Sequence, residues 1–236
     1  MNSFKNQSKL KAFTLSYDDG VTQDMRLIEL LNKYNLKCTF NLNSELLARP
    51  NIMFFKDQKI SQYKLHPCDV KRVYEGHEVA AHTLTHPLLT KLDHDEIVRQ
   101  VEKDRENLSE LVGYEVVGMA YPCGGENNDD RVAEIIKNET NIRYCRTIKS
   151  TGNFEPQTNL YRFNPTAFHL LDHDKLMALG EEFLNLKTDT PKIFYLWGHA
   201  YEMDYYPDSW IKLEEFFKLM SNHPDIFYGT NKEVLL

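Results

Sequence analysis

Short apolar runs alternate with longer amphipathic stretches along most of the chain. Short apolar runs predict strands, and stretches with apolar residues every three or four positions predict helices. The predicted strands cover residues 12–17, 37–42, 78–81, 116–121, 144–147, 164–168, 192–197 and 226–228. The predicted helices cover residues 23–34, 43–47, 69–74, 93–111, 130–137, 172–186 and 209–220, and residues 48–68 are expected to be irregular.

This repeated β–α order predicts the α/β class, with parallel strands and helices outside them. Polar residues follow several of the predicted strands, namely Asp18 with Asp19, Asn41 with Asn43, His82 with His86, Tyr121 with Pro122, and His199. In a barrel such strand ends converge on one face, where active sites lie. We therefore expect a full or incomplete (β/α) barrel of about seven parallel strands rather than an open doubly wound sheet. Because the sequence has no internal repeat, low-complexity segment or linker, residues 1–236 are expected to form one domain.

The composition excludes several partners. The formal net charge of -7 argues against generic binding to nucleic acid or to an anionic membrane. The polar, basic start of the chain shows no secretory signal and no transmembrane segment, which predicts a cytoplasmic protein. The four cysteines have no CxxC spacing and indicate no disulfide framework. Nothing in the sequence predicts an oligomeric state.

The strongest chemical signal is a split set of two acids and two histidines. Asp18 and Asp19 close the first predicted strand, and His82 and His86 follow the strand at 78–81. Asp-Gly is also a common turn, and a single histidine after a strand is usually structural. Together, one aspartate and two histidines make a three-ligand facial set with open positions, which suits catalytic zinc or non-haem iron. The second aspartate is then available as a base, and this favours hydrolysis.

Two later segments add candidate groups. The turn after Ala120, which contains Tyr121 and Cys123, is able to aim backbone N–H groups at an oxyanion. His199 follows Trp197 at the end of another predicted strand and is a candidate general acid. The simpler interpretation of His199 is a structural histidine with satisfied hydrogen bonds.

These blocks resemble the polysaccharide deacetylase family, which is carbohydrate esterase family 4 and includes the nodulation-type chitooligosaccharide deacetylases. The family shows a T/S-F/Y-D-D-G block, an H-S/T-x-x-H block, an R/A-x-P-x-G block and a late L-x-H block, in that order. The matching residues here are 16–20, 82–86, 120–124 and 196–199, so the resemblance covers most of the chain. The first two blocks are specific together, and the last two are weaker. The resemblance implies a distorted, incomplete (β/α) barrel.

The resemblance also implies roles for individual residues. Asp19, His82 and His86 would hold a divalent metal, which is usually zinc in this family. Asp18 would be the general base that activates a metal-bound water, and His199 would protonate the leaving amine. The backbone N–H of Cys123, together with the metal, would stabilise the oxyanion. Further contacts with substrate are expected from Tyr121, Trp197 and Arg162.

The sequence departs from the family pattern at two positions. Many members carry an arginine at the position of Ala120, where it orients the base, and here Arg162 or Arg146 is expected to replace it. Gly198 stands between Trp197 and His199, so the register of the last block also differs.

Three functions are therefore weighed. The preferred one is a metal-dependent hydrolase that removes acetyl from an N-acetylated, or less readily an O-acetylated, sugar or oligosaccharide. The second is hydrolysis of a small non-peptide amide, as in allantoinase-like relatives, which the cytoplasmic prediction favours. The third is a non-catalytic carbohydrate-binding relative. An oxygenase that uses the same facial set is the least favoured alternative.

Overall fold

The computed structural model describes Phe4 and residues 9–236. The strands are β1 (Lys11–Asp18), β2 (Thr39–Leu42), β3 (Ile52–Phe55), β4 (Gln58–Ser61), β5 (Glu78–Ala81), β6 (Gly118–Ala120), β7 (Tyr144–Arg146), β8 (Ala167–Phe168), β9 (Lys192–Gly198) and β10 (Ile226–Tyr228). The α-helices are α1 (Asp24–Lys33), α2 (Pro67–Val73), α3 (His94–Val112), α4 (Asp130–Glu139), α5 (His173–Asn185), α6 (Ser209–Met220) and α7 (Asn231–Leu235). Short 3-10 turns are η2 (Ser44–Leu46), η3 (Leu89–Lys91), η4 (Leu160–Arg162) and η5 (Ala200–Asp204).

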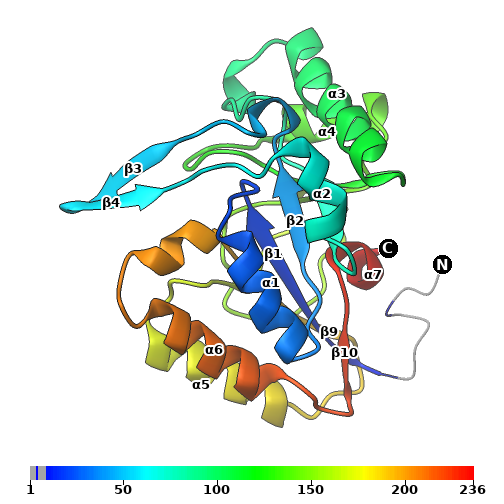
Figure 1. Ribbon diagram of the computed structural model, residues 1–236. Helices are drawn as coiled ribbons and strands as arrows, with labels where there is room; N and C mark the ends of the chain where they lie inside the picture. Colours follow the sequence, from blue (N-terminus) through cyan, green and yellow to red (C-terminus); the bar gives the residue numbers. More distant parts are fainter. Residues whose placement is uncertain (1–3, 5–8) are drawn as a thin grey trace.

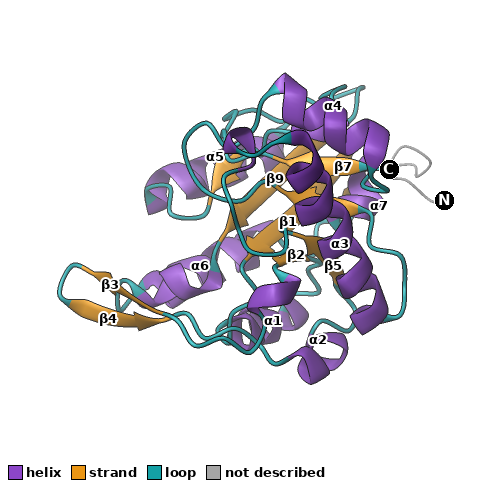
Figure 2. Cartoon of the chain, turned by 90° about the horizontal axis from the view of Figure 1, so that it is seen from above, coloured by secondary structure: helices purple, strands orange, loops and turns teal. Residues whose placement is uncertain are grey.

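One curled sheet forms the centre of the molecule. Within the described residues its strand order is β7-β6-β5-β2-β1-β9-β8, and β10 pairs with the first residues of β1. All of these pairings are parallel, and the helices surround the sheet (Figures 1 and 2). The sheet is a distorted, incomplete (β/α) barrel, which confirms the fold predicted from the β–α alternation.

The central strand β1 brings the sequence blocks together. All eight of its residues are buried, and the strand pairs with both β2 and β9. Asp18 lies opposite Asn41 of β2, and Tyr17 lies opposite Gly198 of β9. Because parallel strands end at the same edge, this register places the loops that follow β1, β2 and β9 side by side.

The predicted helix boundaries agree closely with the structure where a capping residue marks them. The Asp93 side chain accepts a hydrogen bond from the Glu96 backbone N–H at 2.9 Å and begins α3. Gly113 ends that helix in the left-handed region at a φ of 80°.

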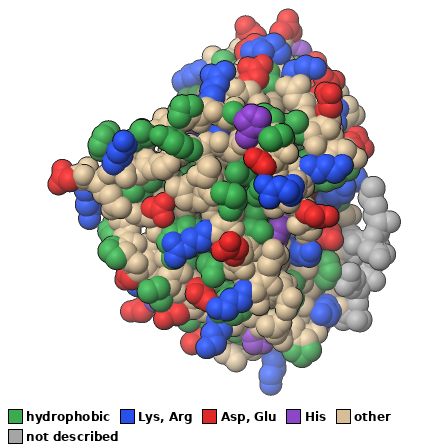
Figure 3. Space-filling view, in the orientation of Figure 1, with side chains coloured by type: hydrophobic (Ala, Val, Ile, Leu, Met, Phe, Trp, Pro, Cys, Tyr) green, Lys and Arg blue, Asp and Glu red, His purple; other side chains and the backbone are tan. Residues whose placement is uncertain are grey.

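The expectation that residues 48–68 are irregular is wrong. Strands β3 and β4 pair antiparallel and form an arm that extends away from the barrel (Figure 1). Phe55 faces η5 and stacks on Tyr205 with ring centroids 4.1 Å apart, whereas Phe54 on the other face is 70% exposed. Apolar side chains are visible along this arm (Figure 3). Such short strands depend on packing against η5, so the local sequence gives only a weak signal for them.

No helix among the described residues is long and apolar enough to cross a membrane. The prediction that the chain has no secretory signal rests on its polar start. This segment lies mostly outside the described residues.

Candidate active site

Three side chains of types that can bind a metal meet above the carboxyl end of β1. Ligand atoms of Asp19, His82 and His86 all lie within 4.8 Å of one another. The two histidines lie on a loop after β5 rather than on a helix, as the proline after His86 predicts. The expected set of one aspartate and two histidines is therefore assembled by the fold.

The backbone around this cluster is strained. Asp19, Thr83, His86 and Cys123 all have left-handed φ angles, of 85°, 69°, 61° and 67°. Residues other than glycine rarely adopt this region, and such residues gather at functional sites because the surrounding structure holds them there. The strain therefore supports a functional role for this face of the barrel.

His82 is fixed in the orientation that a metal ligand needs. Its Nδ1 lies 2.8 Å from the Ala120 carbonyl, which holds that nitrogen protonated and leaves Nε2 for the cluster. Burial lowers the pKa of His82 to about 4, so the ring is neutral at physiological pH. Asp104 accepts the His82 backbone N–H at 2.9 Å and anchors this part of the loop. A neutral imidazole with its second nitrogen engaged is the form that binds a divalent ion.

Lys64, at the base of the β3–β4 arm, supplies a cation to the same cluster. Its Nζ lies 3.0 Å from Asp19 Oδ1, and both side chains are largely buried. Burial by itself would raise the pKa of Asp19, but the Lys64 ammonium and nearby histidines hold it well below its usual range. Asp19 is therefore an ionised carboxylate that already attracts a cation. Together with the neutral His82, it makes the set fit a divalent ion.

Removal of the Lys64 charge should strengthen metal binding. We expect Lys64→Met to lower the Kd for Zn²⁺ by at least about tenfold, because the ammonium repels a dication and competes for Asp19. Competition with a chromophoric chelator measures this, with Lys59→Met on the exposed face of β4 as the matched control. An unchanged or weaker Kd in Lys64→Met would show that the ammonium does not oppose the ion.

Asp18 points to the other side of the β1 end and is held by two partners. Asn41 Nδ2 donates to its Oδ1 at 2.8 Å, and the Arg146 guanidinium lies 2.5 Å from its Oδ2. Arg146 is fully buried and stacks on the Trp197 ring at 4.4 Å. On the paired strands β6 and β7, Arg146 lies directly opposite Ala120. Of the two arginines expected to replace the one missing at Ala120, Arg146 thus contacts Asp18 from the neighbouring strand at the same level, whereas Arg162 pairs with Asp130.

His199 faces Asp18 from the end of β9. Its Nε2 lies 3.9 Å from Asp18 Oδ2, and its Nδ1 lies 3.0 Å from Glu202 Oε2. Glu202 also contacts the buried His169 ring, with 2.6 Å between Nε2 and Oε2. Burial alone would lower the pKa of His199, but its hydrogen bond with Glu202 and the nearby carboxylates raise it to about 9. His199 is therefore protonated at neutral pH, the state that a general acid requires.

The changed register at Gly198 has a steric reason. A Cβ atom at Gly198 would lie 2.3 Å from the His169 ring. Only glycine allows His169 to reach Glu202 behind His199, so the glycine is part of the support for His199.

The other predicted substrate contacts are placed differently. The backbone N of Cys123 lies 3.5 Å from His86 Nε2, next to the cluster. The Tyr121 side chain is instead buried and donates to the Tyr161 carbonyl at 2.8 Å, and one face of the buried Trp197 is covered by Arg146. These two side chains pack the site rather than forming open walls for a sugar. Arg162 lies away from Asp18 and pairs with Asp130.

Comparisons with known proteins agree with this geometry. The sequence profile described as polysaccharide deacetylase matches residues 5–142, more than half of the chain. This chain belongs to the polysaccharide deacetylase family. The match includes the blocks that carry Asp18, Asp19, His82, His86 and Cys123.

Curated relatives of this family are similar to part of the chain. A peptidoglycan N-acetylglucosamine deacetylase of Listeria monocytogenes is 30% identical over 53% of this chain and 24% of its own length. A peptidoglycan N-acetylglucosamine deacetylase of Bacillus cereus is 34% identical over 47% of this chain and 35% of its own. The chain thus spans about a third or less of the length of these relatives.

A solved structure supports the fold over nearly the whole chain. A candidate polysaccharide deacetylase from Mycobacterium smegmatis superposes with a TM-score of 0.65 and 15% identity, covering 96% of this chain and 89% of that one. At this identity the likeness concerns the fold, and it extends the polysaccharide deacetylase barrel beyond the residues that the family profile matches.

Proposed function

We propose that this protein is a metal-dependent deacetylase that hydrolyses the acetamido group of an N-acetylated sugar. The observation that carries the proposal is that the two neighbouring carboxylates face different groups. Asp19 faces His82 and His86, whereas Asp18 is held by Asn41 and Arg146 and faces His199. A base, a set of ligands for a divalent ion and an acid on the far side are what amide hydrolysis needs.

The residues of this chain would then act in sequence. Asp19, His82 and His86 would hold a divalent ion, most simply zinc, which would supply Lewis acidity toward the acetyl carbonyl and lower the pKa of water. Asp18 takes one proton from the attacking water, whose oxygen forms the new bond to the acetyl carbon. The Cys123 N–H, beside the cluster, stabilises the developing oxyanion.

The second half of the reaction breaks the carbon–nitrogen bond. His199 gives its proton to the nitrogen, and the carbon–nitrogen bond breaks. The remaining proton of the attacking water passes to the amine, so the products are a sugar ammonium and acetate. Asn41 and Arg146 keep Asp18 oriented throughout, and Glu202 keeps His199 charged until it donates its proton. The proton that Asp18 takes up balances the one that His199 gives.

Acetate release tests the proposal. With added Zn²⁺, the protein should release acetate from oligomers of N-acetylglucosamine, and a chelator should abolish this reversibly. O-acetylated xylan oligomers and a small cyclic amide serve as parallel substrates. Hydrolysis of the small cyclic amide alone, detected as its ring-opened product because no acetate is released, would favour the second function, and a zinc-binding protein that is inert on every substrate would contradict catalysis.

The pH profile tests the role of Glu202. Because His199 must be protonated, kcat should fall as pH rises through the pKa of His199, and the charge of a bound ion places this fall at or below about pH 9. Glu202→Gln should move this alkaline limb to lower pH, because the carboxylate that raises the pKa is lost. The measurement is kcat against pH for wild type and variant, with Glu214→Gln on α6 as the control. If wild type and Glu202→Gln have identical alkaline limbs, His199 is not a general acid whose pKa is raised by Glu202.

A further inference from the structure

One face of β1 is lined by polar side chains, at a place where barrels usually carry branched apolar residues. Thr14, Ser16 and Asp18 share this face, since alternate residues of a strand point the same way. All three side chains belong to buried residues that are at most 2% exposed. Because buried polar groups need hydrogen-bond partners, this face of β1 depends on polar groups from other elements.

Asn41 connects the upper two of these residues. Its Nδ2 lies 2.8 Å from Asp18 Oδ1 and 2.8 Å from Ser16 Oγ. Its buried Oδ1 has no hydrogen-bond partner among the described residues. The amide that contacts the candidate base is therefore oriented through Nδ2 alone, and Ser16 is one of the acceptors that fix it. Ser16 in turn makes a side-chain hydrogen bond with Tyr195 of β9.

Asn231, the first residue of α7, continues this connection from the last helix of the chain. Its Nδ2 donates to the Tyr195 hydroxyl at 2.5 Å, and its Oδ1 accepts from Thr14 Oγ1 at 2.8 Å. The residue is fully buried. Asn231 thus bridges β1 and β9, the two strands at whose carboxyl ends Asp18 and His199 lie.

The position of Asn231 is itself fixed by two further strands. Its backbone N–H donates to Thr39 Oγ1 at 2.8 Å, at the start of β2. Thr39 Oγ1 lies 2.7 Å from Glu78 Oε2, at the start of β5, and this carboxylate also accepts from the Lys232 backbone N–H at 3.0 Å. Helix α7 is therefore held by β2 and β5 as well as by β1 and β9.

We propose that Asn231 is a positioning residue that acts on Asp18 from the end of the chain. It acts through Tyr195, Ser16 and Asn41, which together are called the interior row. The inference rests on the proposed function and deepens it, since it extends the support of the base to α7. Displacement of a reacting group by about 1 Å is able to cost about a hundredfold in rate.

The test removes single links of the interior row. Asn231→Leu, which keeps a similar volume but loses the bond to Tyr195, should lower kcat for acetate release at least about tenfold. KM and the Kd for Zn²⁺ should stay within about twofold, because no residue of the metal cluster belongs to the row. Tyr195→Phe, which loses only the hydroxyl, should lower kcat at least about fivefold and replaces Asn231→Leu if that variant does not fold. In the double variant the two losses should not multiply, since both break the same row.

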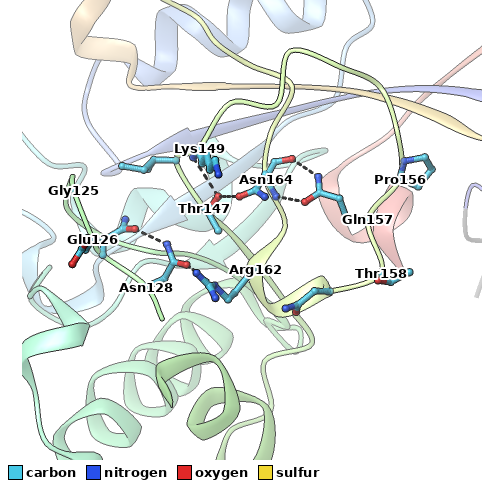
Figure 4. Close-up of a pocket in the computed structure, with 13 residues that line it drawn as sticks. Gly125, Glu126, Asn128, Thr147, Lys149, Pro156, Gln157, Thr158, Arg162 and Asn164 are labelled. Carbon is cyan, nitrogen blue, oxygen red and sulfur yellow. Dashed lines mark hydrogen bonds between the residues drawn. The ribbon is translucent and has the colours of Figure 1, made fainter. Parts of the chain in front are cut away.

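Two control variants separate this effect from general damage. Val234→Ala removes a buried apolar side chain of α7 and destabilises the helix without touching the interior row. Gln157→Met removes an amide that makes hydrogen bonds of 2.7 and 2.9 Å to the main chain of Asn164, in a pocket wall apart from the row (Figure 4). Both controls should keep the kcat of wild type. If Asn231→Leu and Tyr195→Phe also keep it, the inference is overturned.

A measurement without substrate separates this inference from the proposed function. In ¹⁵N–¹H NMR spectra, the side-chain amide hydrogens of Asn41 should exchange with solvent at least about tenfold faster in Asn231→Leu than in Val234→Ala. If wild type releases no acetate from any sugar, the proposed function fails, yet this change would still support the link from α7 to Asn41. Unchanged Asn41 resonances and exchange in both Asn231→Leu and Tyr195→Phe would overturn the link, whatever the activity.

Discussion

Asp18→Asn should lower kcat for acetate release by about a hundred- to ten-thousandfold, the range that a general base contributes. The asparagine side chain keeps the shape but has one acceptor oxygen, so it accepts only one of the hydrogen bonds that Asn41 and Arg146 donate, and it cannot take a proton from water. Asp18 contributes no atom to the candidate metal cluster of Asp19, His82 and His86. The Kd for Zn²⁺ should therefore change little, whereas Asp19→Asn should weaken it strongly.

Acetate release under saturating zinc, together with chelator competition, measures the two effects on one preparation of Asp18→Asn. Circular dichroism confirms folding, because the variant leaves Arg146 without its carboxylate partner. If Asp18→Asn loses both zinc and activity, Asp18 is a metal ligand, and the division of labour between the two carboxylates is wrong. If it retains full kcat, Asp18 is not the base.

Arg146→Met should lower the free energy of unfolding by about 3–5 kcal/mol, the usual cost of leaving one member of a buried ion pair alone. Arg146 is fully buried and Asp18 is 2% exposed, so water cannot replace the lost partner. Methionine fills much of the same space beside Trp197, so the loss should reflect charge more than packing. Urea unfolding followed by tryptophan fluorescence measures it.

A double-mutant cycle separates the pair from its surroundings. Asp18→Asn combined with Arg146→Met removes both charges, and this variant should be more stable than the sum of the two single losses predicts. Arg99→Met on α3, whose ion pair with Glu96 is largely exposed, should change stability by less than about 1 kcal/mol. Additive losses in the cycle would mean that Arg146 stabilises the fold by packing rather than by holding Asp18.

The sequence predicted the elements whose signals are local. Buried apolar runs and the Asp93 cap gave β1 and α3 close to their observed bounds, because strand burial and helix capping depend on a few neighbouring residues. The β3–β4 arm was not predicted, since its strands are short and its stability comes from packing on η5, distant in the sequence.

The candidate site likewise contains some residues that the sequence predicted and others that it did not. The Asp-Asp and His-x-x-x-His blocks are short motifs, and their residues meet as predicted. Lys64, His169 and Glu202 carry no motif of their own. Lys64 reaches the site from the base of the β3–β4 arm, and His169 occupies the space that the missing side chain of Gly198 leaves. Glu202 reaches the site from η5. From the sequence alone, Glu202 is indistinguishable from an acidic residue on the surface. Its role becomes visible only in its burial against His169 and His199.

The sequence by itself therefore determined the barrel class and the residues that gather at the ends of β1 and β5, since strand order and short motifs are local properties. Tertiary structure alone decided how Asp18 is held. Arg146 is 128 positions away from Asp18 along the chain, but the pairing of β6 with β7 places it opposite Ala120 and beside the carboxylate. The register between strands is set by packing across the whole barrel, so no local sequence pattern indicates which arginine faces Asp18.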